Sequence, residues 1–307
     1  MEEIKMGTTL QKSTYFTPEL TNKLFSLVRG KSSLAKLSGA EPMPFNGETV
    51  FTFNFDNEVN LVAESGAKAN GGATLGSVTM TPVKIEYGMR VSDEFKYGAD
   101  EIQLQYLQAF ADGFAAKVAR GLDIMAMHGV NPRTGSSADI LTGKSFDAVV
   151  TNKVEFDEAH IVDNVTTAIN MVEAAEHEVT GMAMAPAMKA ALAAVKTQTN
   201  SNVPLFPELG WGSTAGTLNG LPVDTNSTVS FGSNADRAII GNFRDYFRWG
   251  FSRQLPIEVI EYGDPDNSGS DLKGHNEVYI RGEAYIGWGI IVPAAFAKIR
   301  DEDPASV

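Results

Sequence analysis

A long stretch of this chain, from Glu48 to Phe95, has the pattern of two strands joined by a soft connection. The strand-like runs are Thr49–Phe55 and Ser77–Val91, and the connection Ala63–Gly76 is rich in Gly, Ala, Ser and Asn. The first run alternates, and it places three aromatic side chains on one face: Phe51, Phe53 and Phe55. An isolated two-stranded hairpin is marginal in water because its faces have too little to pack against. We therefore expect this hairpin to pack on another copy of the chain.

Composition excludes several classes of protein. The chain has 307 residues, 43% of them hydrophobic, which suits one large domain or two smaller ones with a packed core. It has no Cys, so disulfides and thiolate chemistry are excluded. No apolar run approaches the roughly 20 residues that span a bilayer, and the acidic start Met1–Glu3 predicts no secretory signal and no membrane partner.

The formal net charge is −13, and the densest basic cluster lies near Arg244, Arg248 and Arg253. Dedicated DNA-binding proteins carry a basic stripe. An acidic chain of this kind argues against recognition of a duplex, but it is compatible with a protein that encloses DNA without gripping it.

The rest of the chain mixes helices with strands. The first sixteen residues predict an extended arm, Thr17-Pro18-Glu19 starts a helix that ends at Gly30, and the longest helical pattern runs from about Asp100 to His128. Further helices are expected at Phe156–Glu178 and from Pro186. Strands are expected at Thr180–Ala185, Arg237–Gly241, Phe243–Gly250, Leu255–Glu261 and Glu277–Ile291. There is no regular alternation of strand and helix, so the fold class is α+β rather than a doubly wound sheet.

One pair of motifs is typical of a nucleotide hydrolase. Ala138–Ser145 is a relaxed phosphate-loop match that contains Lys144, and Asp157–His160 spells a helicase-like box. A phosphate loop needs a buried strand before it and a long helix after it. Here a loop precedes the motif and the strand-like Phe146–Val150 follows it, which favours a chance match. A hydrolase that uses Lys144 and Asp157 remains the alternative from another class.

Other chemistry-bearing residues are scattered. The four His show no metal-ligand spacing, and surface or cap roles are expected for His128, His160, His177 and His275. No cofactor or metal site is therefore predicted. Glu283 lies in an otherwise apolar strand, where a buried carboxylate could act as a base or form a salt bridge with Arg281 or with an arginine from another copy. The aromatic–Arg run Phe243–Trp249 could stack bases, but an edge between subunits is the favoured interpretation.

The order of these parts resembles the major capsid proteins of tailed bacteriophages with the HK97-like fold, which encapsulin nanocompartments share. The resemblance covers nearly the whole chain. It is carried by Leu61–Lys68, Thr81–Lys84, Val91–Phe95, Gly129–Asn131, Leu218–Val223, Asn276–Trp288 and Pro293–Ile299. The resemblance implies an N-terminal arm and first helix (1–46), an extended loop hairpin (47–92), a peripheral domain with a spine helix (93–150), an axial domain (151–254) and a return to the peripheral domain (255–307).

The resemblance also implies function and partners. The chain would be a structural, non-enzymatic subunit of a virion, assembled in the bacterial host cytoplasm, whose hexamers and pentamers form an icosahedral head around double-stranded DNA. An encapsulin shell around protein cargo is the alternative within the same fold. Because Met1 directly precedes the arm, a scaffolding protein is expected to be a separate chain if one is needed. A portal and decoration proteins are further expected partners.

Some members of this family crosslink their subunits: a Lys of the extended loop attacks an Asn of a neighbour, assisted by a Glu. Lys68, Asn276 and Glu283 match these three roles. Similar residues also occur in members of the family that do not crosslink. The residues expected to contact other subunits are Lys68, Arg90, Arg244, Arg248 and Trp249.

Overall fold

The computed structural model describes residues 31–94, 100–198, 201–214, 216–232, 235–252 and 257–302. The predicted arm and the helix after Thr17 lie outside these residues, as does Arg253. The described helices and strands are mixed without βαβ alternation, which confirms the α+β class. None of the described helices is both long enough and apolar enough to cross a membrane.

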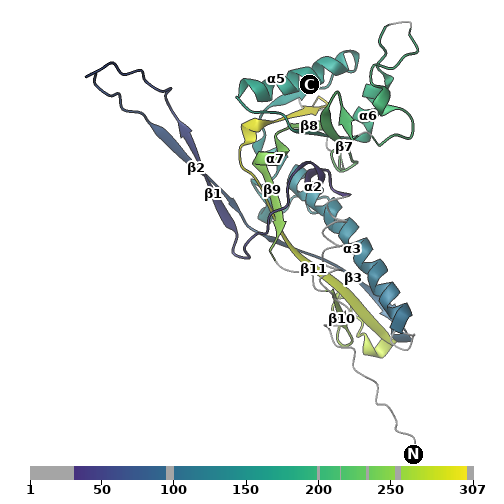
Figure 1. Cartoon of the computed structure of the whole chain (residues 1–307). Coiled ribbons are helices and arrows are strands. Elements are labelled where there is room, and N and C mark those ends of the chain that lie inside the picture. The colour runs from purple at the N-terminus through teal and green to yellow at the C-terminus, as the bar shows by residue number, and fades with distance from the viewer. Residues whose placement is uncertain are drawn as a thin grey trace, which may run out of the picture.

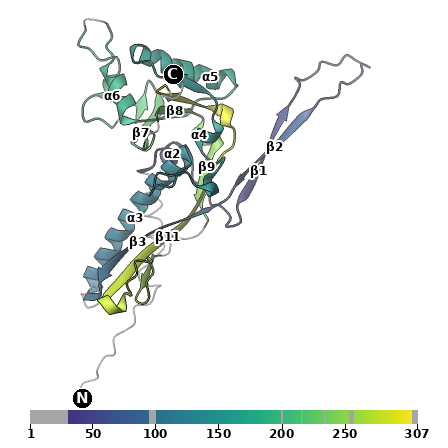
Figure 2. The same ribbon diagram turned by 180° about the vertical axis from the view of Figure 1, so that it is seen from behind.

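The predicted hairpin projects from the rest of the molecule (Figures 1 and 2). Strand β1 (Glu48–Phe55) pairs antiparallel with β2 (Ala73–Met80), from Glu48 opposite Met80 to Phe55 opposite Ala73. The return strand, predicted as one run through Val91, is in fact two: β2 ends at Met80 and β3 (Val83–Ser92) starts after Pro82. Proline has no N–H for a strand ladder, so the chain leaves one sheet there and enters another.

A four-stranded sheet and the long helix form the lower part of the molecule in Figure 1. In this sheet β11 (Glu277–Ile290) pairs with β3, β10 (Ile257–Ile260) and β9 (Phe247–Phe251). The helix α3 spans Asp100–His128, as predicted, and runs beside β3 and β11. It ends at Gly129, whose φ of 68° suits a helix-terminating glycine.

The upper part is built on a six-stranded sheet in the order β4, β12, β8, β5, β7, β6. The strands are β4 (Lys153–Glu155), β5 (Gly181–Met184), β6 (Thr217–Leu218), β7 (Leu221–Thr225), β8 (Asp236–Gly241) and β12 (Phe296–Arg300). Helices α5 (Ile161–Ala174) and α6 (Pro186–Ala194) pack on this sheet, and α5 is shorter than the predicted helix. The turn between β6 and β7 is Asn219-Gly220, both with positive φ, the preferred residues of a tight hairpin.

Two short helices lie in segments where the sequence pattern predicted strands. Phe146–Val150, predicted as strand-like, begins with α4 (Phe146–Val149), and the predicted strand Phe243–Gly250 divides into α7 (Phe243–Tyr246) and β9. Each helix is started by a capping side chain: Ser145 accepts the N–H of Ala148, and Asn242 accepts that of Asp245. Such caps satisfy the free N–H groups at the start of a helix, and an alternating sequence pattern gives no sign of them.

The remaining described elements are short. They are α2 (Ser33–Leu37) and the 3-10 turns Asp139–Leu141, Glu158–His160, Pro207–Leu209, Lys273–His275 and Pro293–Ala295. Two groups of buried apolar side chains form the core. One lies around α3, β9 and β11, and the other lies between the six-stranded sheet, α5 and α6.

Candidate assembly interface

The hairpin carries a row of exposed apolar side chains. Phe51, Phe53 and Phe55 of β1 are 63%, 68% and 76% exposed, and Leu75, opposite Phe53 on β2, is 58% exposed. Exposed apolar patches mark interaction sites, and an uncovered strand pair of this kind invites association. We call these four side chains the aromatic stripe.

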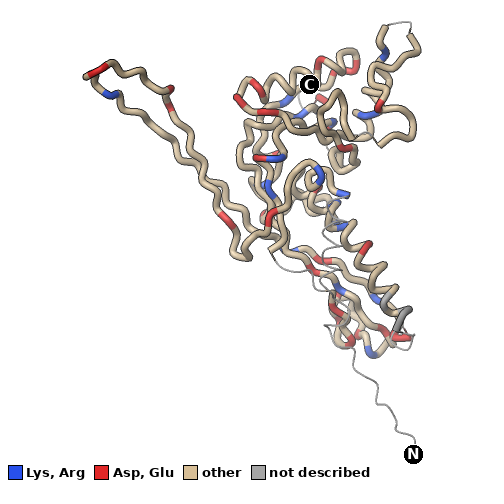
Figure 3. The backbone as a smooth tube through the Cα atoms, in the orientation of Figure 1, with Lys and Arg blue, Asp and Glu red and all other residues tan. Residues whose placement is uncertain are grey.

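The tip of the hairpin, residues 56–72, is exposed throughout. Val59 and Leu61 are each 98% exposed. The tip contains three acidic residues and Lys68, and Figure 3 shows its acidic segments far from the rest of the molecule. The predicted contact residue Lys68 is therefore free to meet another subunit.

A groove of about 760 Å³ lies between β3 and α3. Its apolar lining includes Ile85, Phe114 and Val118. Four basic residues also line it, Lys84, Lys117, Arg120 and Arg133, together with one acidic residue, Glu86. The groove thus combines apolar walls with positive charge, which is the complement of the aromatic stripe and the acidic tip.

Two predicted contact residues, Trp249 and Arg90, make contacts within their own chain. Trp249 is 1% exposed and packs edge-on against Phe251, so its prediction as a contact between subunits is wrong. It lies in β9, whose pairing with β11 covers it. The Arg90 guanidinium forms ion pairs with Asp264 and Asp266 of the loop between β10 and β11 and with Glu277 at the start of β11, and its role between subunits stays a prediction. Arg244 is exposed, and Arg248 lies 3.4 Å from Glu41.

The three residues predicted to crosslink are not brought together within one chain. Lys68 lies in the hairpin tip, and Asn276, exposed and left-handed with φ 53°, precedes β11. Glu283 is seven residues further along, or roughly 23 Å of extended strand. Its carboxylate lies 2.9 Å from the Lys84 ammonium and 3.4 Å from Arg281 Nε. The salt-bridge alternative for Glu283 is thus present in the structure.

The phosphate-loop interpretation is not supported by the backbone. The predicted Lys144 follows a 3-10 turn, and the helix after it has only four residues. Lys144 Nζ donates to Thr81 at 2.5 Å, while Asp157 caps a turn and binds His160 at 2.7 Å. No long helix presents N–H groups to a phosphate here, so the arrangement lacks what that chemistry needs.

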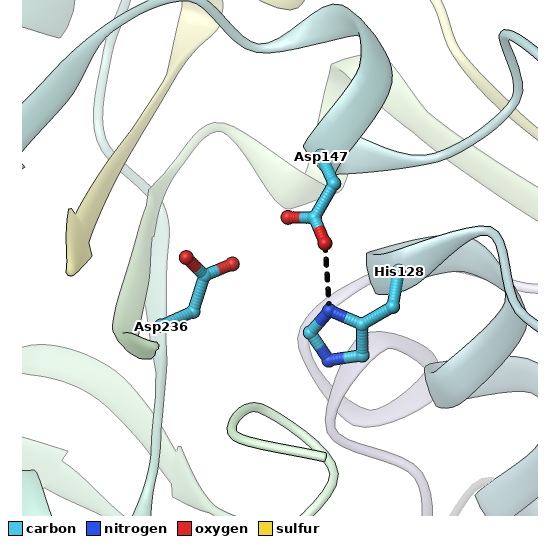
Figure 4. A group of neighbouring side chains, drawn as sticks. All are labelled: His128, Asp147 and Asp236. Carbon is cyan, nitrogen blue, oxygen red and sulfur yellow. Dashed lines mark hydrogen bonds and ion pairs between the residues drawn. The ribbon is translucent and has the colours of Figure 1, made fainter. Parts of the chain in front are cut away.

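A buried charged cluster was missed by sequence reasoning, which expected a surface or cap role for His128 (Figure 4). His128 Nδ1 lies 3.0 Å from Asp147 Oδ2, and its side chain is 3% exposed. The Lys298 ammonium, fully buried, lies 2.5 Å from Asp147 and 3.4 Å from Asp236. The four residues come from α3, α4, β8 and β12, so no local spacing could reveal them.

Electrostatic interactions within this cluster shift the pKa values of its two carboxylates in opposite directions. Burial raises the pKa of Asp147, but the bonds from His128 and Lys298 outweigh it and hold that pKa below its usual value. Burial and the neighbouring charge of Asp147 raise the pKa of Asp236 to about 6. The ligand atoms of His128, Asp147 and Asp236 lie within 4.8 Å of one another, but the Lys298 ammonium already supplies the cation between the carboxylates.

A second buried carboxylate ties α2 to α3. Asp123 of α3 accepts the backbone N–H groups of Ser33 and Leu34 at 2.9 and 3.2 Å. It also accepts the hydroxyls of Ser32 and Thr228. Burial raises the pKa of Asp123 to about 6 against these hydrogen bonds. The residue holds the start of α2 in place, and no local motif signalled it.

Comparison with known proteins agrees with this architecture. The sequence matches the phage capsid family over residues 15–301. A solved structure from Mycobacterium phage Ogopogo has 31% identity and a TM-score of 0.75, covering 89% of this chain and 92% of that one. One from Gordonia phage Cozz has 21% identity and a TM-score of 0.72, covering 97% and 92%. No curated protein gave a significant match.

A further solved structure is described as the capsid of an empty GTA particle with C5 symmetry. It has 14% identity and a TM-score of 0.62, and it covers 99% of this chain and 94% of that chain, which shows likeness of fold. The match to the phage capsid family over most of the chain defines the class of protein, a shell-forming subunit. The chain belongs to the phage capsid family. It is a major capsid protein, the structural subunit of a phage head shell.

Proposed function

We propose that this chain forms hexamers and pentamers of an icosahedral head that encloses double-stranded DNA. The observation that carries this proposal is the projecting hairpin with its aromatic stripe, because a single chain leaves these side chains in water. Burying Phe51, Phe53, Phe55 and Leu75 against a neighbour removes apolar surface from water at about 25 cal/mol per Å². Repetition around a symmetric shell makes many such contacts add up.

The surface that receives the hairpin is the groove between β3 and α3 of the neighbouring subunit. Its apolar walls suit the aromatic stripe, and its basic residues suit the acidic tip. Opposite charges at the rim of an interface favour the correct encounter and orientation. The second copy of this chain is the occupant that this combination fits.

The shell holds DNA without specific contacts, in keeping with the net charge of −13. We expect a structural role without catalysis, and assembly in the host cytoplasm. A separate scaffolding protein, a portal and decoration proteins are the expected partners. Particles from phage-producing cells that carry protein cargo and no DNA would favour the encapsulin alternative.

Assembly of the expressed full-length protein tests the hairpin. We expect the unchanged chain to form shell-like particles in negative-stain electron microscopy and to elute early in size-exclusion chromatography. Phe53→Asp puts a charge into the apolar contact, where a buried unpaired charge costs several kcal/mol, so we expect small oligomers only.

The matched control is Asn54→Asp, which adds the same charge to the next residue of β1, on its other face. It should assemble as the unchanged chain does. Both variants should keep the thermal unfolding of the isolated subunit, since neither side chain is buried in it. Normal shells from Phe53→Asp would overturn the proposed role of the stripe.

Covalent crosslinking between subunits is a separate proposal. In it, Lys68 Nζ forms an amide bond with the side-chain carbonyl carbon of Asn276 in a neighbour, and the amide nitrogen leaves as ammonia. The exposure of Lys68 and Asn276 supports access between subunits. Glu283 of a further subunit would carry the proton from the attacking amine to the leaving nitrogen, which requires this Glu283 to leave its ion pairs with Lys84 and Arg281.

A further inference from the structure

The two ends of the hairpin join the rest of the molecule over a patch of glycines. Strand β9 carries Gly250, and β11 carries Gly287 and Gly289. Gly250 pairs with Gly287 across the two strands, and Gly289 lies two residues further along β11, so all three glycines lie on the same face of the sheet. A face without side chains lets another segment approach the backbone closely. We call these three residues the glycine floor.

A methionine from each end of the hairpin packs on this floor. Met43, which precedes β1, lies on Gly287, where an added Cβ would overlap its sulfur atom. Met80, the last residue of β2, lies on Gly289 in the same way. The two methionines are 5% and 1% exposed. A long, unbranched side chain fills an irregular space of this kind well, so both ends of the hairpin are buried against β11.

Backbone contacts hold the first end of the hairpin in place. The N–H of Glu41 donates to the carbonyl oxygen of Trp249, in β9, at 2.9 Å. The chain then turns, and the N–H of Gly47 donates to the carbonyl oxygen of Pro44 at 2.9 Å. Gly47 has a φ of 83°, and a Cβ there would lie 2.7 Å from the carbonyl oxygen of Met80. The two ends of the hairpin therefore contact each other as well as the sheet.

A lysine side chain supports the second end of the hairpin. Lys144 Nζ donates to the hydroxyl of Thr81, the residue that follows β2, at 2.5 Å. The backbone of Lys144 is itself held in place, because its carbonyl oxygen accepts the Nε1–H of Trp288 at 2.8 Å. Trp288 lies in β11 and is 2% exposed. The lysine of the relaxed phosphate-loop match is therefore a contact of the hairpin.

We infer that the glycine floor, its two methionines and Lys144 form a rigid base, which holds the hairpin in one direction in the free subunit. A hairpin that swings freely would need a base with few buried apolar contacts, and this base is buried. The use of the base rests on the proposed function. A hairpin that is already directed towards its neighbour loses little freedom on association, and such preorganisation strengthens binding.

The distance between the hairpin and the rest of the full-length chain tests this inference. The chain has no Cys, so Asn54→Cys on β1 and Thr167→Cys on α5, both exposed, can carry a donor and an acceptor dye. In subunits dispersed by dilution, the nanosecond decay of the donor gives the distribution of distances. Residue 54 lies roughly 20 Å along the strand from the base, so a tilt of about 15° moves it by about 5 Å. We expect one narrow distribution, and a broad one overturns the inference.

Two variants of the labelled chain test the residues of the base. Gly289→Ala places a methyl group against Met80, and Lys144→Met removes the ammonium that bonds to Thr81. Each variant should shift or broaden the distribution of distances by several ångströms. If Gly289→Ala does not fold, Lys144→Met decides the question, because Lys144 is only partly buried. A narrow and unshifted distribution in every base variant that folds overturns the assignment of the base.

Matched controls separate the base from general effects of substitution. Gly39→Ala adds a Cβ that meets nothing within 4 Å, and Lys153→Met replaces an exposed lysine of β4. Lys144→Arg keeps a donor near Thr81. All three should keep the narrow distribution. The outcome is separate from that of the proposed function: a narrow distribution in a chain that forms no shells supports the rigid base and contradicts the proposed shell, whereas normal shells with a broad distribution do the reverse.

Discussion

At the scale of single residues, the buried cluster around His128 stands out. Nδ1 of this histidine faces the Asp147 carboxylate, and Nε2 lies 2.8 Å from the carbonyl oxygen of Thr228. A neutral imidazole has one N–H and can satisfy only one of these acceptors, so the doubly protonated ring fits the site. Burial lowers the pKa of His128, but the bond and charge of Asp147 outweigh this and raise it above its usual value.

This arrangement predicts that stability falls as pH rises above neutrality. A histidine whose pKa is raised on folding stabilises the fold fully below its unfolded pKa of about 6.5, and this contribution is lost as pH rises through the folded pKa. The free energy of unfolding of the subunit should therefore decrease as the pH rises above about 6.5. Urea unfolding at a series of pH values measures it.

The control for this pH dependence is His128→Gln, which cannot titrate. Its unfolding free energy should be lower at pH 6.5 and flatter above it. Asp123 and Asp236, with pKa values of about 6, also lower the free energy of unfolding as the pH rises, but they do so between pH 3.8 and 6. The decrease above pH 6.5 is therefore assigned to His128. An equal slope in both proteins above pH 6.5 would exclude the assignment.

At the scale of elements, the packing of α3 on the sheet depends on a glycine of β11. A Cβ added at Gly282 would lie 2.9 Å from the ring of Phe114, which is 3% exposed. The helix and the strand therefore approach as closely as they do because this position has no side chain. Phe114 also stacks on Phe110 one turn earlier, which restricts its movement.

We predict that Gly282→Ala destabilises the subunit by about 1–3 kcal/mol, the usual cost of overpacking a core. Gly274→Ala is the matched control, because a Cβ there would meet nothing within 4 Å. Thermal unfolding of both variants makes the comparison. Adding Phe114→Leu to Gly282→Ala should recover part of the loss; if Gly282→Ala is as stable as the unchanged chain, the close approach has no energetic role.

At the scale of the whole molecule, the hairpin stands apart from the two packed parts of the chain. Any bond between Lys68 and Asn276 must therefore join different subunits. Assembled particles boiled in SDS test this: crosslinking predicts a ladder above the monomer band on a gel. The ladder should disappear in Lys68→Arg, which keeps the charge but is not a nucleophile under these conditions. A single band at monomer mass from the unchanged particles excludes crosslinking.

Local patterns predicted the elements that local physics controls. The spacing of apolar residues placed α3 from Asp100 to His128, and alternation placed β1 and β11 within a residue or two of their bounds. The alternation rule wrongly predicted strand at α4 and α7, because a single capping side chain is enough to start a helix of four residues. Trp249 resembled a residue of an exposed edge, and only the pairing of β9 with β11 shows that it is covered.

The sequence by itself determined that this chain is an α+β subunit with a hairpin that needs a partner, because alternation and glycine content act over a few neighbouring residues. Only the tertiary structure decided which charges meet. Arg90 lies 174 residues from Asp264, and Lys298 lies 151 from Asp147, so these ion pairs depend on the complete set of strands. Electrostatic contacts act through space over a few ångströms, and the distance along the chain carries no information about them.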